Sequence, residues 1–254
     1  MKRSVTEVRY SDAETGELPR TVAESIYHRL RQDILWGRFA PGSPLRSDEL
    51  RSRYDVGISP LREALTRLTS ERLVISIGQR GFRVSPLTAY DIEDTARTRV
   101  VIEREALANS IENGDIRWET AVVATFHALS RNPVPKEPGP ATAGWSICHR
   151  RFHMALLSAC GSRWQIELAE RLFDQAERHR LLRVKFAPAE RLKRDTVREH
   201  KQIFDATLSR DVKAAQRALE KHYLTTAKQV VAVLARFPRL VHKSAREARG
   251  GGVA

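Results

Sequence analysis

The chain has 254 residues, of which 41% are hydrophobic, so it is long enough for two domains with separate cores. No apolar run reaches the roughly 20 residues of a membrane span, and the first residues lack a signal peptide's apolar stretch. We therefore expect neither a membrane protein nor a secreted one. The net charge of +13 indicates a polyanionic partner such as nucleic acid, and two cysteines are too few for a disulfide framework, which fits the reducing cytoplasm.

Helical patterns fill the first part of the chain, after a polar segment, residues 1–19, that we expect to be a mobile arm. Three helices are expected there: Thr21 to Trp36, Asp48 to Tyr54, and Ser59 to about Ser70. Thr21 and Glu24 form a capping box at the first helix. Ser59 before Pro60 is typical of a helix N-cap that is followed by proline in the first turn.

The period of the apolar residues then changes from helical to alternating. Residues 73–77 and 82–84 are expected to form two strands, joined as a hairpin through Gly78-Gln79-Arg80-Gly81. Three helices followed by a hairpin, all within residues 20–86, predict a winged helix-turn-helix, which is a DNA-binding fold.

From residue 87 the pattern is helical almost throughout, which predicts an all-α bundle over residues 87–236. The expected helices are Thr88–Asn113, Ile116–Arg131, Thr142–Ala159, Arg163–Phe186, Pro188–Ser209 and Asp211–Ala235. Residues 132–140 are proline-rich and indicate a surface loop, and residues 237–254 indicate a basic, flexible tail. The expected fold class is therefore mainly α.

In a helix-turn-helix the second helix enters the major groove and presents its N-terminal residues to the bases. Here that helix begins at Ser59, and Arg62 is its first long polar side chain, suited to a guanine or a phosphate. The candidate DNA contacts are polar residues on and around it, namely Arg46, Ser59, Arg62, Gln79 and Arg80. In the alternative interpretation Arg62 pairs with Glu63 or a neighbouring helix, and Arg80 is merely solvated.

Several short motifs occur in this part of the chain: Pro41-Gly42, Pro60-Leu61-Arg62-Glu63-Ala64-Leu65, Arg67-Leu68, Leu73-Val74 and Gly81-Phe82-Arg83-Val84. With them, residues 20–86 resemble the amino-terminal domain of GntR-type regulators, which implies DNA binding. The family usually has Ser-Arg where this chain has Gly57-Ile58, and that arginine commonly touches DNA. The operator sequence therefore stays open.

Four of the eight histidines lie on apolar stripes of three expected helices: His149, His153, His200 and His222. The first two are four residues apart and so share one helix face. A shared metal ion would satisfy all four buried imidazoles, whereas a lone buried histidine usually bonds to a backbone carbonyl. From these residues alone both interpretations stay open.

Further motifs lie between Asp91 and about Leu234: Arg99 with Glu103, Phe152-His153, Glu199-His200 and His222. This segment resembles the FCD effector domain of the FadR subfamily, and the likeness extends to a glutarate-responsive member. In the metal-binding branch of that subfamily, the three histidines of these motifs are metal ligands. The fourth ligand, usually an aspartate, lies four residues before the histidine of the Phe-His motif. The resemblance thus implies that His149, His153, His200 and His222 hold a divalent metal, zinc or nickel, with His149 replacing the aspartate.

Four neutral imidazoles leave the +2 charge of such an ion uncompensated, which favours an anionic oxygen at any open coordination position. Arg99, on the first helix of the bundle, has a fork that suits a carboxylate, and the alternative is a structural pair with Glu103. A small carboxylate effector, glutarate or 2-hydroxyglutarate, is therefore expected to bind between the metal and Arg99.

The expected function is that of a transcriptional regulator, most often a repressor in such proteins, which acts as a homodimer on double-stranded operator DNA. A metal-dependent enzyme with an appended DNA-binding domain is the alternative. Four histidines leave little room in a tetrahedral zinc site, although an octahedral ion would keep open positions. Glu199 should point away from the site because it adjoins His200. Nonspecific binding to the chromosome would explain the charge but not the histidines.

Overall fold

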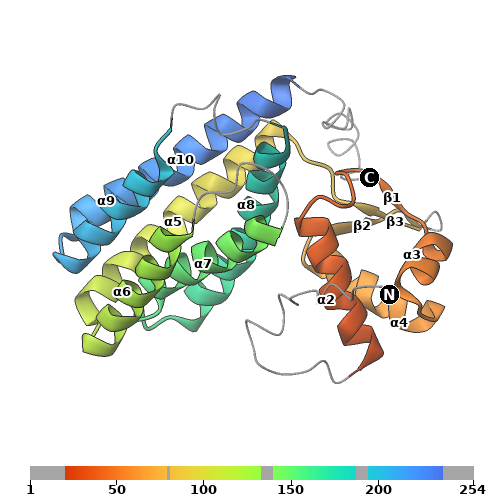
Figure 1. Ribbon diagram of the computed structural model, residues 1–254, viewed down its shortest axis with the longest axis horizontal. Coiled ribbons are helices and arrows are strands. Elements are labelled where there is room, and N and C mark those ends of the chain that lie inside the picture. Colours follow the sequence, from red (N-terminus) through yellow and green to blue (C-terminus); the bar gives the residue numbers. More distant parts are fainter. Residues whose placement is uncertain (1–20, 79–80, 133–139, 187–193, 237–254) are drawn as a thin grey trace, which may run out of the picture. The chain divides into compact units, whose positions relative to one another are not determined.

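The computed structural model describes residues 21–78, 81–132, 140–186 and 194–236. The described residues form two compact units, the first with residues 21–34 and 43–85, the second with residues 35–42 and 86–236. The expected arm, the expected tail and the hairpin tip with Gln79 and Arg80 lie outside the described residues. The chain is mainly helical, as predicted (Figure 1).

The first unit combines helices with a small sheet. Its elements are α2 (Val22–Leu35), β1 (Pro44–Leu45), α3 (Ser47–Tyr54), α4 (Ile58–Ser70), β2 (Val74–Ser76) and β3 (Phe82–Val84). The strands are antiparallel in the order β1-β3-β2, with Val74 opposite Val84 and Pro44 opposite Arg83. Strand β1 was not expected, because two residues after a turn carry no alternating pattern, and only the pairing with β3 makes them a strand.

The helix starts of this unit agree only in part with the capping signals. The Thr21 hydroxyl accepts a hydrogen bond from the Glu24 backbone N–H at 3.1 Å, as expected. Helix α4, however, begins at Ile58 with Gly57 as its N-cap, so the prediction of Ser59 as the cap is wrong. Pro60 is then the third helical residue, a position where the missing N–H would have had no partner within the helix.

One face of α4 fills the core of the first unit. Its buried residues are Leu61, Ala64, Leu65 and Leu68, at the spacing of an amphipathic helix. Leu30 of α2 and Leu73 are fully buried in the same unit. The opposite face, which carries Arg62, is left to solvent.

The second unit is helical throughout its described residues. Its elements are α5 (Ala89–Asn113), α6 (Ile116–Arg131), α7 (Pro140–Leu157), α8 (Arg163–Phe186), α9 (Thr196–Leu208) and α10 (Val212–Arg236). Thr88 caps α5 and Asp115 caps α6 through bonds to backbone N–H groups. Helix α9 begins at Thr196, where Asp195 accepts a bond from the Arg198 N–H at 2.9 Å. Pro188, the expected start of this helix, lies outside the described residues.

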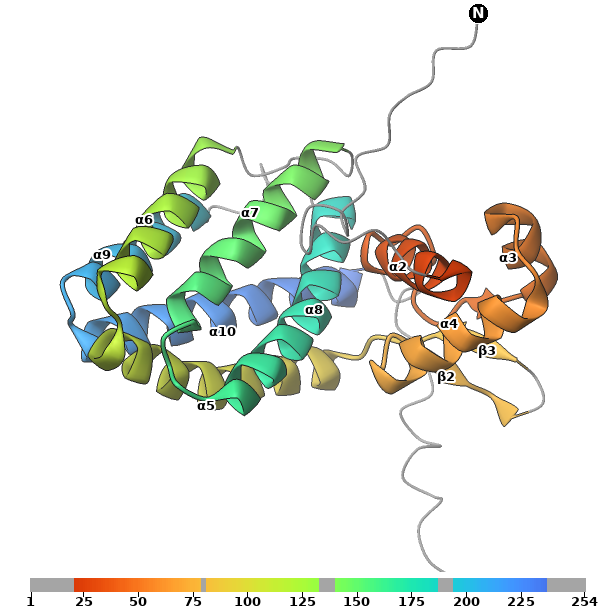
Figure 2. The same ribbon diagram turned by 90° about the horizontal axis from the view of Figure 1, so that it is seen from below.

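These helices pack side by side around a shared core (Figures 1 and 2). Helix α10 packs along α5, α8 and α9, α5 also packs against α8, and α6 packs against α7. Phe152, Leu156, Ile203 and Leu219 are fully buried in this core, on the same helices as the four histidines. The apolar stripes therefore turn α7, α9 and α10 toward one another. Among the described residues, no helix is both long enough and apolar enough to cross a membrane.

Candidate metal centre

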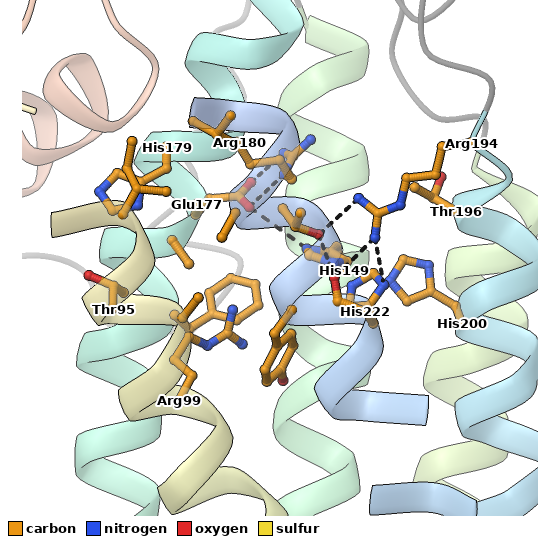
Figure 3. A pocket seen from close by; sticks show the side chains of 18 of the residues that line it. Thr95, Arg99, His149, Glu177, His179, Arg180, Arg194, Thr196, His200 and His222 are labelled. Carbon is orange, nitrogen blue, oxygen red and sulfur yellow. Dashed lines mark hydrogen bonds and ion pairs between the residues drawn. The ribbon is translucent and has the colours of Figure 1, made fainter. Parts of the chain in front are cut away.

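The four predicted histidines meet inside the second unit. His149 and His153 come from α7, His200 from α9 and His222 from α10, and one nitrogen from each ring lies within 4.8 Å of all the others. Each residue is buried, with between 1% and 7% of its surface exposed. Figure 3 shows His149, His200 and His222 facing a common space. Four nitrogens at this separation can surround one divalent ion.

Unpartnered ring nitrogens support this fit. His149 Nδ1, His153 Nε2 and His200 Nε2 are buried and have no hydrogen-bond partner. A buried polar atom without a partner costs about 1–3 kcal/mol, so native proteins seldom leave three of them together. An ion that accepts the lone pairs of His153 Nε2 and His200 Nε2 would remove that cost for two of them, whereas His149 Nδ1 faces the Glu177 carboxylate at 3.7 Å. The donor set is therefore suited to a metal with a preference for imidazole.

Burial also keeps the imidazoles uncharged. It lowers the pKa of His149 from 6.5 to about 4, and it lowers the pKa of His153 and His200 well below 6.5. The pKa of His222 is lowered as well, again because of burial. An ordinary imidazole pKa would let protons compete with a metal below about pH 6.5. The lowered values move this competition to more acidic solutions, so the lone pairs are available at neutral pH.

A glutamate fixes the orientation of the His222 ring. Glu199 Oε2 lies 2.8 Å from His222 Nδ1, and Arg194 Nε donates to Glu199 Oε1 at 2.7 Å. Burial would raise the pKa of Glu199, but bonds from His222 and Arg194 lower it to about 2. The carboxylate thus accepts the Nδ1 proton, and Nε2 of His222 is left as the ligand atom. The expectation that Glu199 points away from the histidines is wrong.

A second glutamate stands behind His149. Glu177 Oε2 lies 3.7 Å from His149 Nδ1, and Arg180 donates to both oxygens of the same carboxylate. Burial alone would raise the pKa of Glu177, but Arg180 and His149 hold it below its ordinary value. Trp145 stacks on the His149 ring with 4.4 Å between ring centroids, and the Arg180 guanidinium lies 4.2 Å from the Trp145 ring centre.

Sequence reasoning missed Glu177, Arg180 and Arg194. The first two are three residues apart on α8, which is an ordinary spacing for a surface ion pair, and Arg194 lies just before α9. No local pattern links them to histidines on other helices. His179 is also buried and lines the cavity described next.

A cavity opens beside the histidines. It is lined by His149, His200 and His222 together with Arg99, Arg180 and Arg194, among other residues, and its empty volume is about 700 Å³, including the part open to solvent. Figure 3 shows the three arginines around the histidine rings. The cavity thus joins a potential metal centre to three arginines, each of which is also paired with a glutamate.

Arg99 forms the pair with Glu103 that the sequence allowed as the alternative to effector binding. Its Nε donates to Glu103 Oε1 at 2.6 Å and its Nη2 to Oε2 at 3.2 Å, with both side chains buried. Burial would lower the pKa of Arg99, but Glu103 raises it above its ordinary value. Because Arg99 also lines the cavity, a role in effector binding stays a prediction.

The described DNA-contact candidates all lie at the surface of the first unit. Arg46, Ser59 and Arg62 are exposed, and Arg46 pairs with Glu49 at 3.2 Å. Within the described part of the chain, Arg62 forms no ion pair with Glu63 or any other residue. Its guanidinium is thus available to a partner molecule. Contacts of these residues with DNA stay a prediction.

Comparison with known proteins agrees with this architecture. Residues 22–84 match the family described as "Bacterial regulatory proteins, gntR family", and residues 94–225 match the FCD domain. The HTH-type transcriptional regulator BphR of Paraburkholderia xenovorans is 39% identical over 205 residues, which are 80% of this chain and 82% of BphR. The HTH-type transcriptional repressor GlaR of Escherichia coli is 35% identical over 201 residues, 78% of this chain and 91% of GlaR.

Solved structures share the fold. A transcriptional regulator GntR from Rhodococcus sp. RHA1 has a TM-score of 0.66 and 23% identity, over 83% of this chain and 97% of that one. The relatives are named as regulators, which favours a regulator over the enzyme considered as the alternative. The chain therefore belongs to the gntR family of bacterial regulatory proteins, DNA-binding transcriptional regulators, and it carries an FCD domain after its helix-turn-helix.

Proposed function

We propose that the protein is a repressor that binds a palindromic operator as a homodimer in the cytoplasm, and that a divalent metal and a small carboxylate effector control its affinity for DNA. One observation carries the regulatory part: three of the four clustered histidines, His149, His200 and His222, line the same cavity as three arginines. The relative GlaR is named a transcriptional repressor, which supports repression, rather than activation, as the effect of this protein on transcription. The likeness to the FadR subfamily, and within it to the carbon-starvation-induced regulator CsiR, supports a glutarate-like effector.

The proposed metal is zinc or nickel, held by His149, His153, His200 and His222. Both ions accept neutral imidazole nitrogens, which is the donor that burial preserves here. When bound, the ion supplies a positive charge and a position for an oxygen ligand. The glutamates behind the rings, Glu177 and Glu199, are each paired with an arginine, so they do not neutralise that charge. An anionic effector is therefore favoured.

Arg99 is the proposed anchor for a second carboxylate of the effector. Glu103 occupies Nε and Nη2 of Arg99, which leaves Nη1 for a ligand in the cavity. A molecule with one carboxylate on the ion and another on Arg99 would be a small dicarboxylate such as glutarate or 2-hydroxyglutarate. The effector can change operator affinity only if it binds two conformational states of the protein with different affinities.

Isothermal titration calorimetry of glutarate, succinate and a monocarboxylate into zinc-saturated protein tests the effector. Replacing Arg99 by lysine keeps a positive charge beside Glu103. It removes the planar guanidinium, whose several N–H groups can bind Glu103 and a carboxylate of the effector at the same time. We expect R99K to weaken glutarate binding about tenfold or more, because a charge-assisted hydrogen bond contributes about 1.5–3 kcal/mol, and to change monocarboxylate binding little. Arg97→Lys, an exposed change two residues away on α5, is the matched control. Equal affinity for all three acids, or binding that does not need the metal, would contradict the proposal.

A further inference from the structure

A chain of buried hydrogen bonds runs from Arg99 to the histidine cluster through side chains of two helices. Arg99 holds Glu103 one turn further along α5. Glu103 Oε2 accepts a bond from the Tyr223 hydroxyl of α10 at 2.5 Å, and the Tyr223 oxygen lies 3.1 Å from His153 Nδ1. Glu103 is fully buried, and Tyr223 and His153 are at most 4% exposed. No member of the chain is positioned by solvent.

The direction of each proton in this chain follows from what each group can donate. A carboxylate paired with arginine can only accept, so the single Tyr223 proton points to Glu103. The Tyr223 oxygen has no further proton and must accept from the imidazole, so His153 carries its proton on Nδ1. The lone pair of that ring is therefore on Nε2, which is the nitrogen found buried and unpartnered in the cluster.

One further contact holds Tyr223 in place. The Arg99 guanidinium lies 3.8 Å from the centre of the Tyr223 ring, an attractive contact between a cation and an aromatic face. Arg99 thus touches Tyr223 directly and also through Glu103. Moving the Tyr223 hydroxyl would break both its bond to Glu103 and the bond from His153. Glu103 and Arg99, which are not proposed ligands, therefore fix the position of the Tyr223 ring.

We propose that Tyr223 and Glu103, braced by Arg99, are positioning residues that hold His153 with Nε2 toward the metal. The proposal rests on the metal centre of the proposed function and adds residues that are not ligands. Partners of this kind fix the tautomer of a ligating histidine, and their loss weakens metal binding about 10- to 100-fold. They also link Arg99, at the cavity wall, to one of the ligands.

Tyr223→Phe tests this role with little change in shape. We expect the variant to bind zinc about 10- to 100-fold more weakly than the wild type in competition with a chromophoric chelator. Nitrogen-15 NMR of the metal-free protein gives an independent readout, since the wild-type His153 ring should carry its proton on Nδ1 and the variant ring should populate both tautomers. The first unit offers a matched control: Tyr27 donates to Glu71, which pairs with Arg31, far along the chain from any proposed ligand. Tyr27→Phe should leave zinc affinity and the His153 spectrum unchanged.

Two results would overturn the proposal. In the first, Y223F binds zinc as tightly as the wild type; in the second, wild-type His153 carries its proton on Nε2. Failure of the proposed function is distinguishable, because then the wild type itself would bind no zinc. Equal weakening in Y223F and Y27F would also overturn the proposal, since it would show a general loss of stability and no specific orientation of His153.

Discussion

Replacing His153 and His200 together by alanine should abolish stoichiometric binding of zinc or nickel. The two residues supply ligands from different helices, α7 and α9, and the remaining rings of His149 and His222 are 6.5 Å apart between centroids. Two histidines are fewer than the three or four protein ligands that hold zinc in proteins. Elemental analysis of gently purified protein, followed by zinc titration, measures the effect.

Thermal unfolding of the same variant gives a second measure. A metal at 1,000 times its dissociation constant adds about 4.1 kcal/mol to the free energy of unfolding, so zinc should raise the wild-type Tm and leave the H153A/H200A Tm unchanged. The matched control, His28→Ala/His127→Ala, removes two histidines that are not in the cluster and should retain the metal. Unchanged metal content in H153A/H200A would rule the site out.

Affinity for operator DNA should fall about 10³- to 10⁵-fold between 50 and 200 mM salt. A dimer that contacts about 6–10 phosphates releases as many counterions, and this release dominates the salt dependence. Arg46→Ala should weaken binding to all sequences alike and reduce the salt slope by about one, as expected for a phosphate contact. Fluorescence anisotropy over a salt series, with operator and scrambled duplexes, measures both the slope and the selectivity.

Arg62→Ala should act differently in the same assay. If Arg62 contacts a base, its loss should cost about 1–3 kcal/mol on the operator and little on the scrambled duplex, so selectivity falls. The exposed guanidinium without an ion pair among the described residues is the reason for choosing this position. Salt-independent affinity, or footprinting that protects only an asymmetric site, would contradict specific binding by a dimer.

The helices could be predicted from the sequence because they follow local periodicity, and the same periodicity placed the four histidines on inward-facing stripes. That the four share one site followed from the resemblance to the FCD domain and not from periodicity. His149 and His153 share one face of α7 at four-residue spacing, and His200 and His222 lie on buried stripes of α9 and α10. Helix α6 was predicted with the bounds that the structure has, since Asp115 caps its start. Such signals depend on neighbouring residues only.

The side chains behind the ligands could not be predicted in this way. Tyr223 meets Glu103 across 120 residues of sequence, and Glu177 meets His149 from another helix. Glu199 was misjudged because adjacency to His200 was treated as decisive, whereas its carboxylate reaches the ring of His222 on α10. These contacts depend on how the helices pack against one another, and no periodicity in the sequence encodes them.

In the proposed regulation, a carboxylate changes operator affinity through a metal held by the four histidines. The most direct measurement is fluorescence anisotropy of a selected operator duplex with zinc-loaded protein, titrated with glutarate, beside the same titration on chelator-treated protein and on H153A/H200A. We expect glutarate to release the operator only from the zinc-loaded wild type, with the coupling of roughly 5- to 150-fold that is typical between linked sites. An operator affinity that is unaffected by glutarate, or affected equally without the metal, would contradict it.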